Sequence, residues 1–285
     1  MNYQLVIFTI FVLFALKEAL HTGLFKKASE DSADGIVEMG STFLLFAISQ
    51  PLVLFSAAFI MSLLFPEYQG ALANTAIVVQ VVLLLIFDDL TQYWWHRKCH
   101  SVRWLYNLHR AHHNAKYMSV RIVFRNNFFY YAIMPSLWCS GVLIYLGLGQ
   151  VYAFYLVVKL TVIIGAHAEW KWDKALYENK YTSKLMWLVE RTISTPSTHS
   201  AHHGYNDEDG ITTYKGNYGN LLFFWDVLFG TAKITRRYPS HYGVKGMLKA
   251  AWPEQLFWPL VPSALDKKKR LAKRAEIANS VSNKI

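Results

Sequence analysis

The feature that most restricts the fold of this chain is a set of long apolar runs. Five stretches rich in Leu, Ile, Val and Phe cover residues 3–16, 41–65, 71–87, 128–149 and 151–166. The hydrocarbon core of a bilayer is about 30 Å thick, and roughly 20 helical residues are needed to cross it. The second and fourth runs are long enough, and the others must extend into flanking polar residues or stop partway. We therefore expect an all-α fold, a polytopic bundle of about four to five membrane helices, in a single domain over residues 1–285.

Turn residues divide these runs into two helical hairpins. Pro66 and Gly70 lie between the second and third runs, and Gly147, Gly149 and Gln150 lie between the fourth and fifth. Proline and glycine are the strongest local breakers of regular structure. Each hairpin leaves one side of the membrane and returns to it. The polar segments that follow the third and fifth runs are therefore expected on the same side.

The positions of the 29 Lys and Arg residues support this topology. All but Lys159 fall at residues 17–40, at residues 88–127 or beyond residue 166, and both tight turns hold none. Because cytoplasmic loops carry an excess of Lys and Arg, we expect the N-terminus outside and the C-terminus in the cytoplasm. The net charge of +10 then needs no nucleic-acid partner. Residues 264–285 are interpreted as a solvated basic cytoplasmic tail.

Lys159 is the one basic residue inside an apolar run. A charge within a membrane segment is costly, and it usually faces the interior of the bundle or snorkels to an interface. Two interpretations stay open at this point. Lys159 is either a snorkelling or helix-packing residue, or a contact for the headgroup of a substrate.

Nine of the eleven histidines lie between positions 96 and 203, in groups with helical spacing. Side chains three and four residues apart share one face of a helix, so each group directs its imidazoles the same way. The groups are separated by no membrane crossing or by two, so all should reach the same cytoplasmic face. Thr195, Pro196 and Gly204 predict the bounds of a short helix that carries the last group. The candidate site residues are His96, His100, His109, His112, His113, His167, His199, His202 and His203.

The number of histidines indicates two metal ions. Imidazole binds zinc, copper, iron and nickel, and a closed zinc site needs only four ligands. Iron suits a redox reaction, whereas zinc cannot change valence. Metal-bound imidazoles usually donate their second nitrogen to a carboxylate or a carbonyl. Asp89, seven residues before His96, and Glu169, two residues after His167, are candidates for this role, and equally for ordinary interfacial or capping acids.

Two other classes of protein also use histidines in membranes. A non-catalytic metal-binding or metal-transport protein is the main alternative, but a transporter places its polar ligands inside the spans, near the midplane. Here the histidine groups follow the ends of the runs. A membrane zinc protease would carry an HExxH motif with glutamate as general base, and the sequence has none. Single histidines are usually surface residues, but three spaced groups and a fourth member matched by topology favour one shared site.

Four histidine elements occur in order: HRKCH at 96–100, HRAHH at 109–113, the isolated His167, and HSAHH at 199–203. With the stretch from Asn217 to Thr231, they resemble the fatty acid hydroxylase and sterol desaturase superfamily of membrane di-iron enzymes. The resemblance covers roughly residues 75–235, which we interpret as the catalytic region. Shorter matches at 167–169 and 195–199 are similar to alkylglycerol monooxygenases, a branch that cleaves ether lipids with a pterin as reductant.

The resemblance implies an O2-dependent di-iron oxidoreductase that hydroxylates or desaturates a membrane lipid. The lipid would be a fatty acyl chain, a sterol or an alkylglycerol ether. The nine histidines would hold two iron ions in a cytoplasmic helical cap and serve as the catalytic residues. Electrons would come from a separate electron-transfer partner or a reduced pterin, because the sequence has no iron-sulfur pattern and no GxGxxG motif. The substrate, the position oxidised and the oligomeric state do not follow from the sequence.

Overall fold

The computed structural model describes residues 3–21, 33–247 and 250–263. These residues form helices and turns, with two isolated β-bridges and no β-strand among them. Within these described ranges, four helices are long and apolar enough to cross a membrane: Tyr3–His21, Asp34–Leu64, Ile77–Ser101 and Pro135–His167. The prediction of an all-α membrane bundle is confirmed. The basic segment 264–285 lies outside the described residues.

The long helices are built from shorter elements in chain order. They are α1 (Tyr3–His21), α2 (Asp34–Phe43), η1 (Leu44–Ser49), α3 (Gln50–Leu64), η2 (Pro66–Tyr68), α4 (Ile77–Leu84), η3 (Leu85–Leu90), α5 (Thr91–Ser101), α8 (Pro135–Leu143), η5 (Ile144–Leu148) and α9 (Gly149–His167). Elements η1, η3 and η5 are π-helical turns, a rare form that is frequent at functional sites. A helix satisfies its own backbone hydrogen bonds, so apolar sequence in lipid takes this form.

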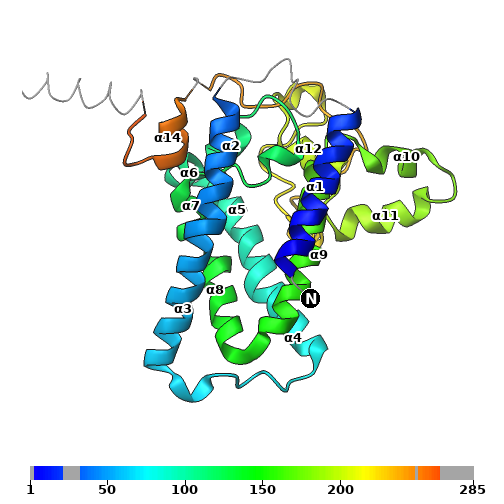
Figure 1. The fold of residues 1–285 in the computed structure, drawn as a ribbon. Helices are drawn as coiled ribbons and strands as arrows, with labels where there is room; N and C mark the ends of the chain where they lie inside the picture. The colour runs from blue at the N-terminus through cyan, green and yellow to red at the C-terminus, as the bar shows by residue number, and fades with distance from the viewer. Residues whose placement is uncertain (1–2, 22–32, 248–249, 264–285) are drawn as a thin grey trace, which may run out of the picture.

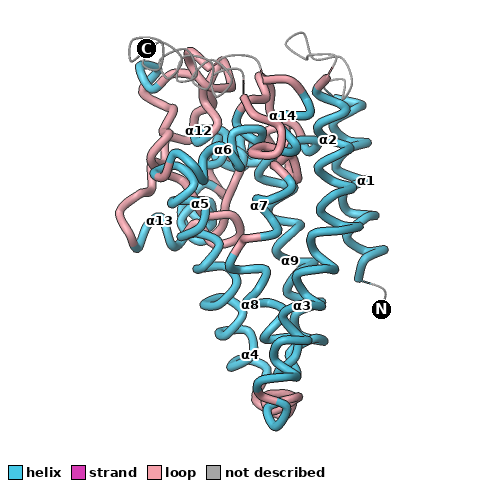
Figure 2. Tube along the Cα trace, turned by 90° about the vertical axis from the view of Figure 1, so that its left-hand side faces the viewer, coloured by secondary structure: helices cyan, strands magenta, loops and turns pink. Residues whose placement is uncertain are grey.

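Shorter elements surround one end of the bundle. They are α6 (Arg103–His113), η4 (Val120–Ile122), α7 (Phe128–Ala132), α10 (Trp172–Glu178), α11 (Ser183–Thr192), α12 (Pro196–His202), η6 (Asp207–Asp209), α13 (Phe224–Leu228) and α14 (Trp252–Phe257). Figure 1 shows α6, α12 and α14 at the end opposite the α3–α4 connection. In Figure 2 most loops gather at that same end, where they form a cap on the membrane helices.

The two predicted hairpin turns lie side by side at the other end of the bundle (Figure 1). The Gly70 amide donates to the Tyr145 carbonyl at 3.0 Å, and the Leu72 amide donates to the Leu146 carbonyl at 2.8 Å. The chain reverses at Gly147, whose φ of 108° is unfavourable for residues with a Cβ. A Cβ there would also lie 2.8 Å from Ala73. The fourth long helix is therefore a bent pair, in which α8 and α9 run in opposite directions.

The structure corrects the bounds of one predicted run. Residues 128–149 were expected to form one continuous helix, but α7 ends at Ala132 and α8 begins at Pro135. Met134, which precedes this proline, has the extended conformation that the proline ring favours. Small side chains shape the packing within the bundle as well. A Cβ on Gly141 of α8 would lie 2.6 Å from the Cβ of Ala57 in α3, so glycine allows these two helices to approach closely.

Candidate metal centre

The structure brings all nine candidate histidines together, in two groups that could each hold a metal ion. Within each group, one ring nitrogen of every histidine lies within 4.8 Å of those of the others. The five-histidine group contains His96, His100, His109, His113 and His202, and the four-histidine group contains His112, His167, His199 and His203. His21 and His241, which the sequence analysis left out, are exposed and belong to neither group.

Four helices supply these rings. Helix α5 supplies His96 and His100, and α9 supplies His167 at its last residue. Helix α6 contributes to both groups, because His109 and His113 share one face while His112 faces the other group. Helix α12 and the residue after it also contribute to both groups, because His202 belongs to the five-histidine group and His199 and His203 belong to the four-histidine group. The two groups are therefore held next to each other by shared helices.

In five of the rings, the Nδ1 atom is hydrogen-bonded to an oxygen that can only accept. Asn126 Oδ1 accepts from His109 Nδ1 at 2.8 Å, and its amide nitrogen in turn donates to Tyr131. Four further rings bond to backbone carbonyls through Nδ1: His96 to Tyr218 (2.7 Å), His112 to Ile122 (3.0 Å), His167 to Ile163 (2.7 Å) and His202 to Gly216 (2.8 Å). A carbonyl can only accept, so in the neutral rings the proton sits on Nδ1. The Nε2 atoms then carry lone pairs.

These lone pairs face one another inside each group. His96 Nε2 lies 3.0 Å from His202 Nε2 in the five-histidine group. His112 Nε2 lies 3.3 Å from His167 Nε2 in the four-histidine group. Neither atom of such a pair has a proton to donate, so each contact is repulsive unless a cation lies between the rings. Two ligands at about 2.1 Å from one ion and at right angles to each other are about 3.0 Å apart, which agrees with these separations.

Burial keeps the rings neutral and ready to bind a metal. The pKa of each cap histidine lies well below its ordinary value of 6.5. The main cause is desolvation by burial, and the charges of neighbouring histidines lower the pKa further. These cap residues are His109, His112, His113, His199, His202 and His203. His100 Nε2 is also buried and has no hydrogen-bond partner among the described residues. Neutral imidazole is the form that coordinates metals.

Of the two carboxylates suggested as partners of these rings, Asp89 has other contacts. Asp89 is buried, and its carboxylate accepts from the Leu222 amide at 3.2 Å and from the Trp225 indole at 2.8 Å. It therefore anchors the segment that follows Tyr218, while Tyr218 itself binds His96. The Nδ1 atom of His167 bonds to the Ile163 carbonyl of its own helix rather than to Glu169. Carbonyls, not these two acids, fix the orientation of His96 and His167.

The short helix α12 begins where the sequence predicted. Thr195 is its N-cap, Pro196 follows, and Thr195 and Thr198 form a reciprocal capping box. Asp173 strengthens this end, because its carboxylate accepts from the Ser197 amide at 2.8 Å. A carboxylate at a helix N-terminus also interacts favourably with the helix dipole. These contacts fix the rotation of α12 and hence the direction of its imidazoles.

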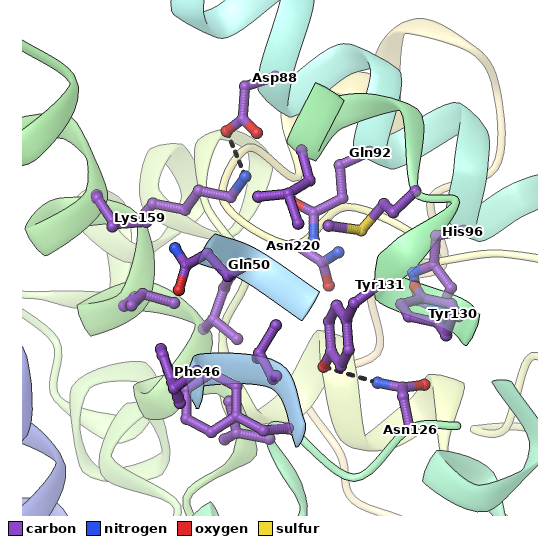
Figure 3. Close-up of a pocket in the computed structure, with 18 of the residues that line it drawn as sticks. Phe46, Gln50, Asp88, Gln92, His96, Asn126, Tyr130, Tyr131, Lys159 and Asn220 are labelled. Carbon is purple, nitrogen blue, oxygen red and sulfur yellow. Dashed lines mark hydrogen bonds and ion pairs between the residues drawn. The ribbon is translucent and has the colours of Figure 1, made fainter. Parts of the chain in front are cut away.

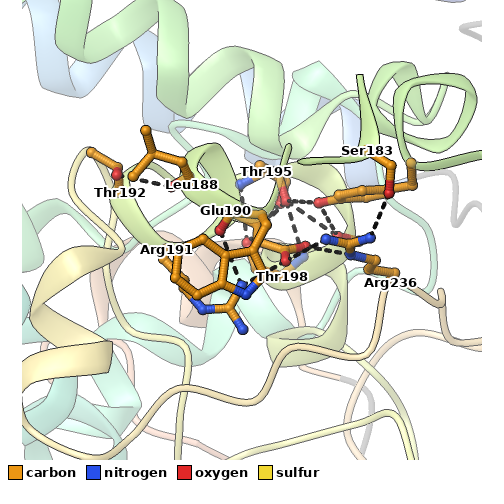
Figure 4. Close-up of polar contacts among 11 residues, drawn as sticks. Ser183, Leu188, Glu190, Arg191, Thr192, Thr195, Thr198 and Arg236 are labelled. Carbon is orange, nitrogen blue, oxygen red and sulfur yellow. Dashed lines mark hydrogen bonds and ion pairs between the residues drawn. The ribbon is translucent and has the colours of Figure 1, made fainter. Parts of the chain in front are cut away.

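A polar network ties α12 to α10 and α11 (Figure 4). The buried carboxylate of Glu190 accepts two hydrogen bonds from Arg236, both at 2.9 Å. The guanidinium lies over the Tyr177 ring, 4.9 Å from its centroid. The Tyr177 hydroxyl is 3.2 Å from Thr195 Oγ1 and 3.0 Å from Ser197 Oγ. Sequence reasoning missed Glu190 and Arg236, because they are far apart in the chain and neither lies in a motif.

Two cavities reach the histidines from different sides. One of about 110 Å³ is lined by His96, His112 and His167 together with residues of the membrane helices (Figure 3). The other, of about 360 Å³, is lined by His100 and His113 together with residues of the segments 206–215 and 244–245. The site therefore lies between the membrane interior and the loops of the cap.

Lys159 lines the smaller cavity, and the structure excludes the snorkelling interpretation. The side chain is buried and forms an ion pair with Asp88. Asp88 also accepts hydrogen bonds from Tyr155 at 2.6 Å and from Ser140 at 3.1 Å. The charge of Lys159 is therefore compensated inside the bundle.

Comparison with known proteins agrees with this geometry. A family model described as fatty acid hydroxylase matches residues 81–231. Curated relatives include alkylglycerol monooxygenases from Xenopus tropicalis (28% identical over 148 residues), Danio rerio (24% over 151) and Homo sapiens (26% over 144). Each match covers 50% of this chain and 28% of the relative, so the chain spans only part of these proteins. No solved structure matches the chain.

Proposed function

The chain belongs to the fatty acid hydroxylase family, and from this premise we propose that it is a di-iron enzyme that uses O2 to oxidise a membrane lipid. The observation that carries the proposal is the pair of histidine groups in which unprotonated nitrogens face each other. Without cations, both groups would hold repulsive contacts in a buried place. With one cation each, the same contacts become coordination bonds.

The donor set favours two iron ions. We propose that the five-histidine group holds one ion and the four-histidine group holds the other. Five nitrogen ligands in one group exceed the four that a structural zinc site takes, and imidazole suits iron. When bound, the two irons would supply the redox chemistry that reduces O2 and oxidises a C–H bond. The histidines are placed at the end of the membrane helices, which does not favour a transport pathway through the midplane.

The protein's own residues orient and enclose the site. Acceptors such as the Tyr218 carbonyl and Asn126 fix the tautomer and the plane of the rings. Burial of the rings excludes water, which would otherwise compete for the ions. The cavity beneath His96, His112 and His167 is the place where a lipid carbon would be positioned. These tasks require residues from many parts of residues 75–235, which we propose as the catalytic region.

The finer identity of the reaction is part of the proposal. Hydroxylation or desaturation of a fatty acyl chain, a sterol or an alkylglycerol ether fits the family, and the relatives named alkylglycerol monooxygenase make an alkylglycerol the first substrate to test. Electrons would come from a separate protein or from a reduced pterin. We further propose that the histidine end faces the cytoplasm and that the N-terminus lies outside, because the two hairpin turns at the other end hold no Lys or Arg.

Metal analysis of histidine variants tests the proposal. The purified full chain should contain two irons, and His112→Ala and His202→Ala should lose iron and lipid oxidation together. His241→Ala, at an exposed histidine outside both groups, should retain both. Lipid oxidation is measured by mass spectrometry with 18O-labelled oxygen. Full iron content in both ligand variants, or a chain that takes up one zinc and no iron, would refute the assignment.

A further inference from the structure

A second cavity adjoins the small one beneath the histidines. It has a volume of about 550 Å³. The two cavities share Phe46, Gln50, Phe124, Leu156 and Leu160. The rest of the larger cavity is lined mainly by α1 and α3, through residues such as Ile7, Phe8 and Leu54. Both are membrane helices, and Glu18 is the only buried residue of α1, so this outer cavity lies at the lipid-facing side of the bundle.

The two cavities differ in size, so each can hold a different part of a ligand. Sites for small ligands usually measure about 300–1,000 Å³. The outer cavity, at about 550 Å³, falls in this range, whereas the inner one, at about 110 Å³, admits only the end of a molecule. The neck between them contains the edge-to-face ring pair of Phe46 and Phe124, with centroids 4.9 Å apart. A flexible single chain fits this arrangement better than a bulky ring system.

The polarity of the lining indicates which end of the ligand lies in the inner cavity. The outer cavity is lined mostly by Phe, Leu and Ile side chains. The inner cavity adds polar groups that the outer one lacks: Asp88, Gln92, Asn126, Lys159 and Asn220, besides its histidines and tyrosines. Figure 3 shows Gln50, Gln92, Asn220 and Lys159 around one region of this inner space. A lipid is therefore expected to enter with its polar end first and to leave its chain in the outer cavity.

Hydrogen bonding inside the cavity indicates that the polar end is uncharged. Lys159 and Asp88 neutralise each other, so the part of the inner cavity away from the histidines offers no net charge to a carboxylate or a phosphate. Gln92 Oε1, in contrast, is buried and has no hydrogen-bond partner among the described residues. A buried acceptor without a donor costs about 1–3 kcal/mol. A hydroxyl group on the ligand would remove this cost.

We propose that the two cavities form one lipid channel, which binds a single-chain lipid with a hydroxyl-bearing, uncharged end. The hydroxyl donates to Gln92, the chain passes Phe46 and Phe124, and the remainder lies against α1 and α3. The carbons beside the polar end are then the ones nearest His96, His112 and His167. The channel deepens the proposed function by naming the substrate class, and only its connection to oxidation rests on that function.

Photoaffinity labelling tests the direction of binding without requiring turnover. The probes are two long-chain alcohols, one with a diazirine beside the hydroxyl and one with a diazirine in mid-chain. They are added to the full-length protein in phosphatidylcholine nanodiscs, and labelled residues are identified by mass spectrometry. The first probe should label the inner lining at residues 123–137, and the second should label residues 7–11 and 51–54. The reverse pattern, or equal labelling of the lipid-facing Phe55, would overturn the proposal.

Variants test the contacts within the channel. Gln92→Leu should weaken competition by an unlabelled alcohol about five-fold, as expected for one lost hydrogen bond. Phe46→Trp should slow labelling of the inner lining, whereas Phe43→Trp, at an exposed residue outside both cavities, should not change it. If a fatty acid competes as well as the alcohol of equal length, the proposal that the polar end of the ligand is uncharged is wrong. Normal labelling without any lipid oxidation would contradict the proposed function and leave the channel standing.

Discussion

Replacing Lys159 with methionine should destabilise the protein by about 3–5 kcal/mol, the usual cost of removing one partner from a buried ion pair. Methionine keeps most of the length of the side chain but leaves Asp88, which is 4% exposed, without its cation. Tyr155 and Ser140 still donate to the carboxylate, but neither carries a charge. For a chain of this size 1 kcal/mol corresponds to about 2–4 °C in Tm. We therefore expect Tm to fall by roughly 10 °C.

A second substitution separates the ion pair from the packing. The double variant Lys159→Met/Asp88→Leu removes both charges, so most of the stability should return. Part of the loss should remain, because the Tyr155 hydroxyl then has no acceptor, at a cost of about 1–3 kcal/mol. Ser140 keeps a second acceptor in the Ser136 carbonyl, at 2.9 Å. Adding Tyr155→Phe to the double variant should recover the remainder.

The assay is thermal unfolding in detergent, followed by the fluorescence of the ten tryptophans. Wild type, the single variant, the double variant and the triple variant are compared at one protein and detergent concentration. A double variant no more stable than Lys159→Met would refute the argument, because the loss would then not come from an uncompensated charge. A single variant with an unchanged Tm would show that water reaches the pair.

Three further predictions concern the turn and the metal centre. Gly147→Ala should lower stability by about 1–3 kcal/mol and reduce Tm, because φ is 108° and the new Cβ would meet Ala73. The control Gly35→Ala should not lower Tm, because the space around Gly35 is open. Asn126→Ala should weaken iron binding about 10–100-fold in chelator competition, because His109 loses the acceptor that orients it. With one equivalent of iron, native mass spectrometry should show chains with no iron and with two, because α6 and α12 are shared; a dominant one-iron species would contradict this cooperativity.

The helical spacing of the histidines was sufficient to predict which rings gather. Residues three and four apart on one helix share a face, and the number of membrane crossings determines which groups can meet. The division into groups of five and four could not be predicted in this way. Each spaced set was expected to face one way, but adjacent residues of a helix point about 100° apart, so His112 and His113 enter different groups. Which other rings complete each group depends on the angles between the helices. Helix crossing angles depend on packing, which has no local signature.

The partners of the imidazoles could not be predicted for a different reason. In the sequence, acidic side chains are the recognisable candidates for such partners, and Asp89 and Glu169 were predicted on that basis. The structure instead uses carbonyls, such as those of Gly216 and Tyr218, which every residue type possesses. The position of these carbonyls depends on the segment between α12 and α13, and Asp89 anchors this segment through Leu222 and through Trp225 in the first turn of α13. Asp89 thus acts on His96 through the backbone of this segment.

The position of the site between two cavities connects these observations. The membrane helices supply His96, His100 and His167, of which His96 and His167 line the inner cavity, and the cap supplies the other six rings through α6, α12 and the residue after α12. Because α6 and α12 contribute to both groups, any movement of the cap relative to the bundle changes both groups at once. The anchors of the cap, Asp89 and the Glu190–Arg236 network, are buried or half-buried. A lipid that fills the channel would contact η1 and α9 but none of these anchors, so it can exchange with the bilayer while the histidine geometry is preserved.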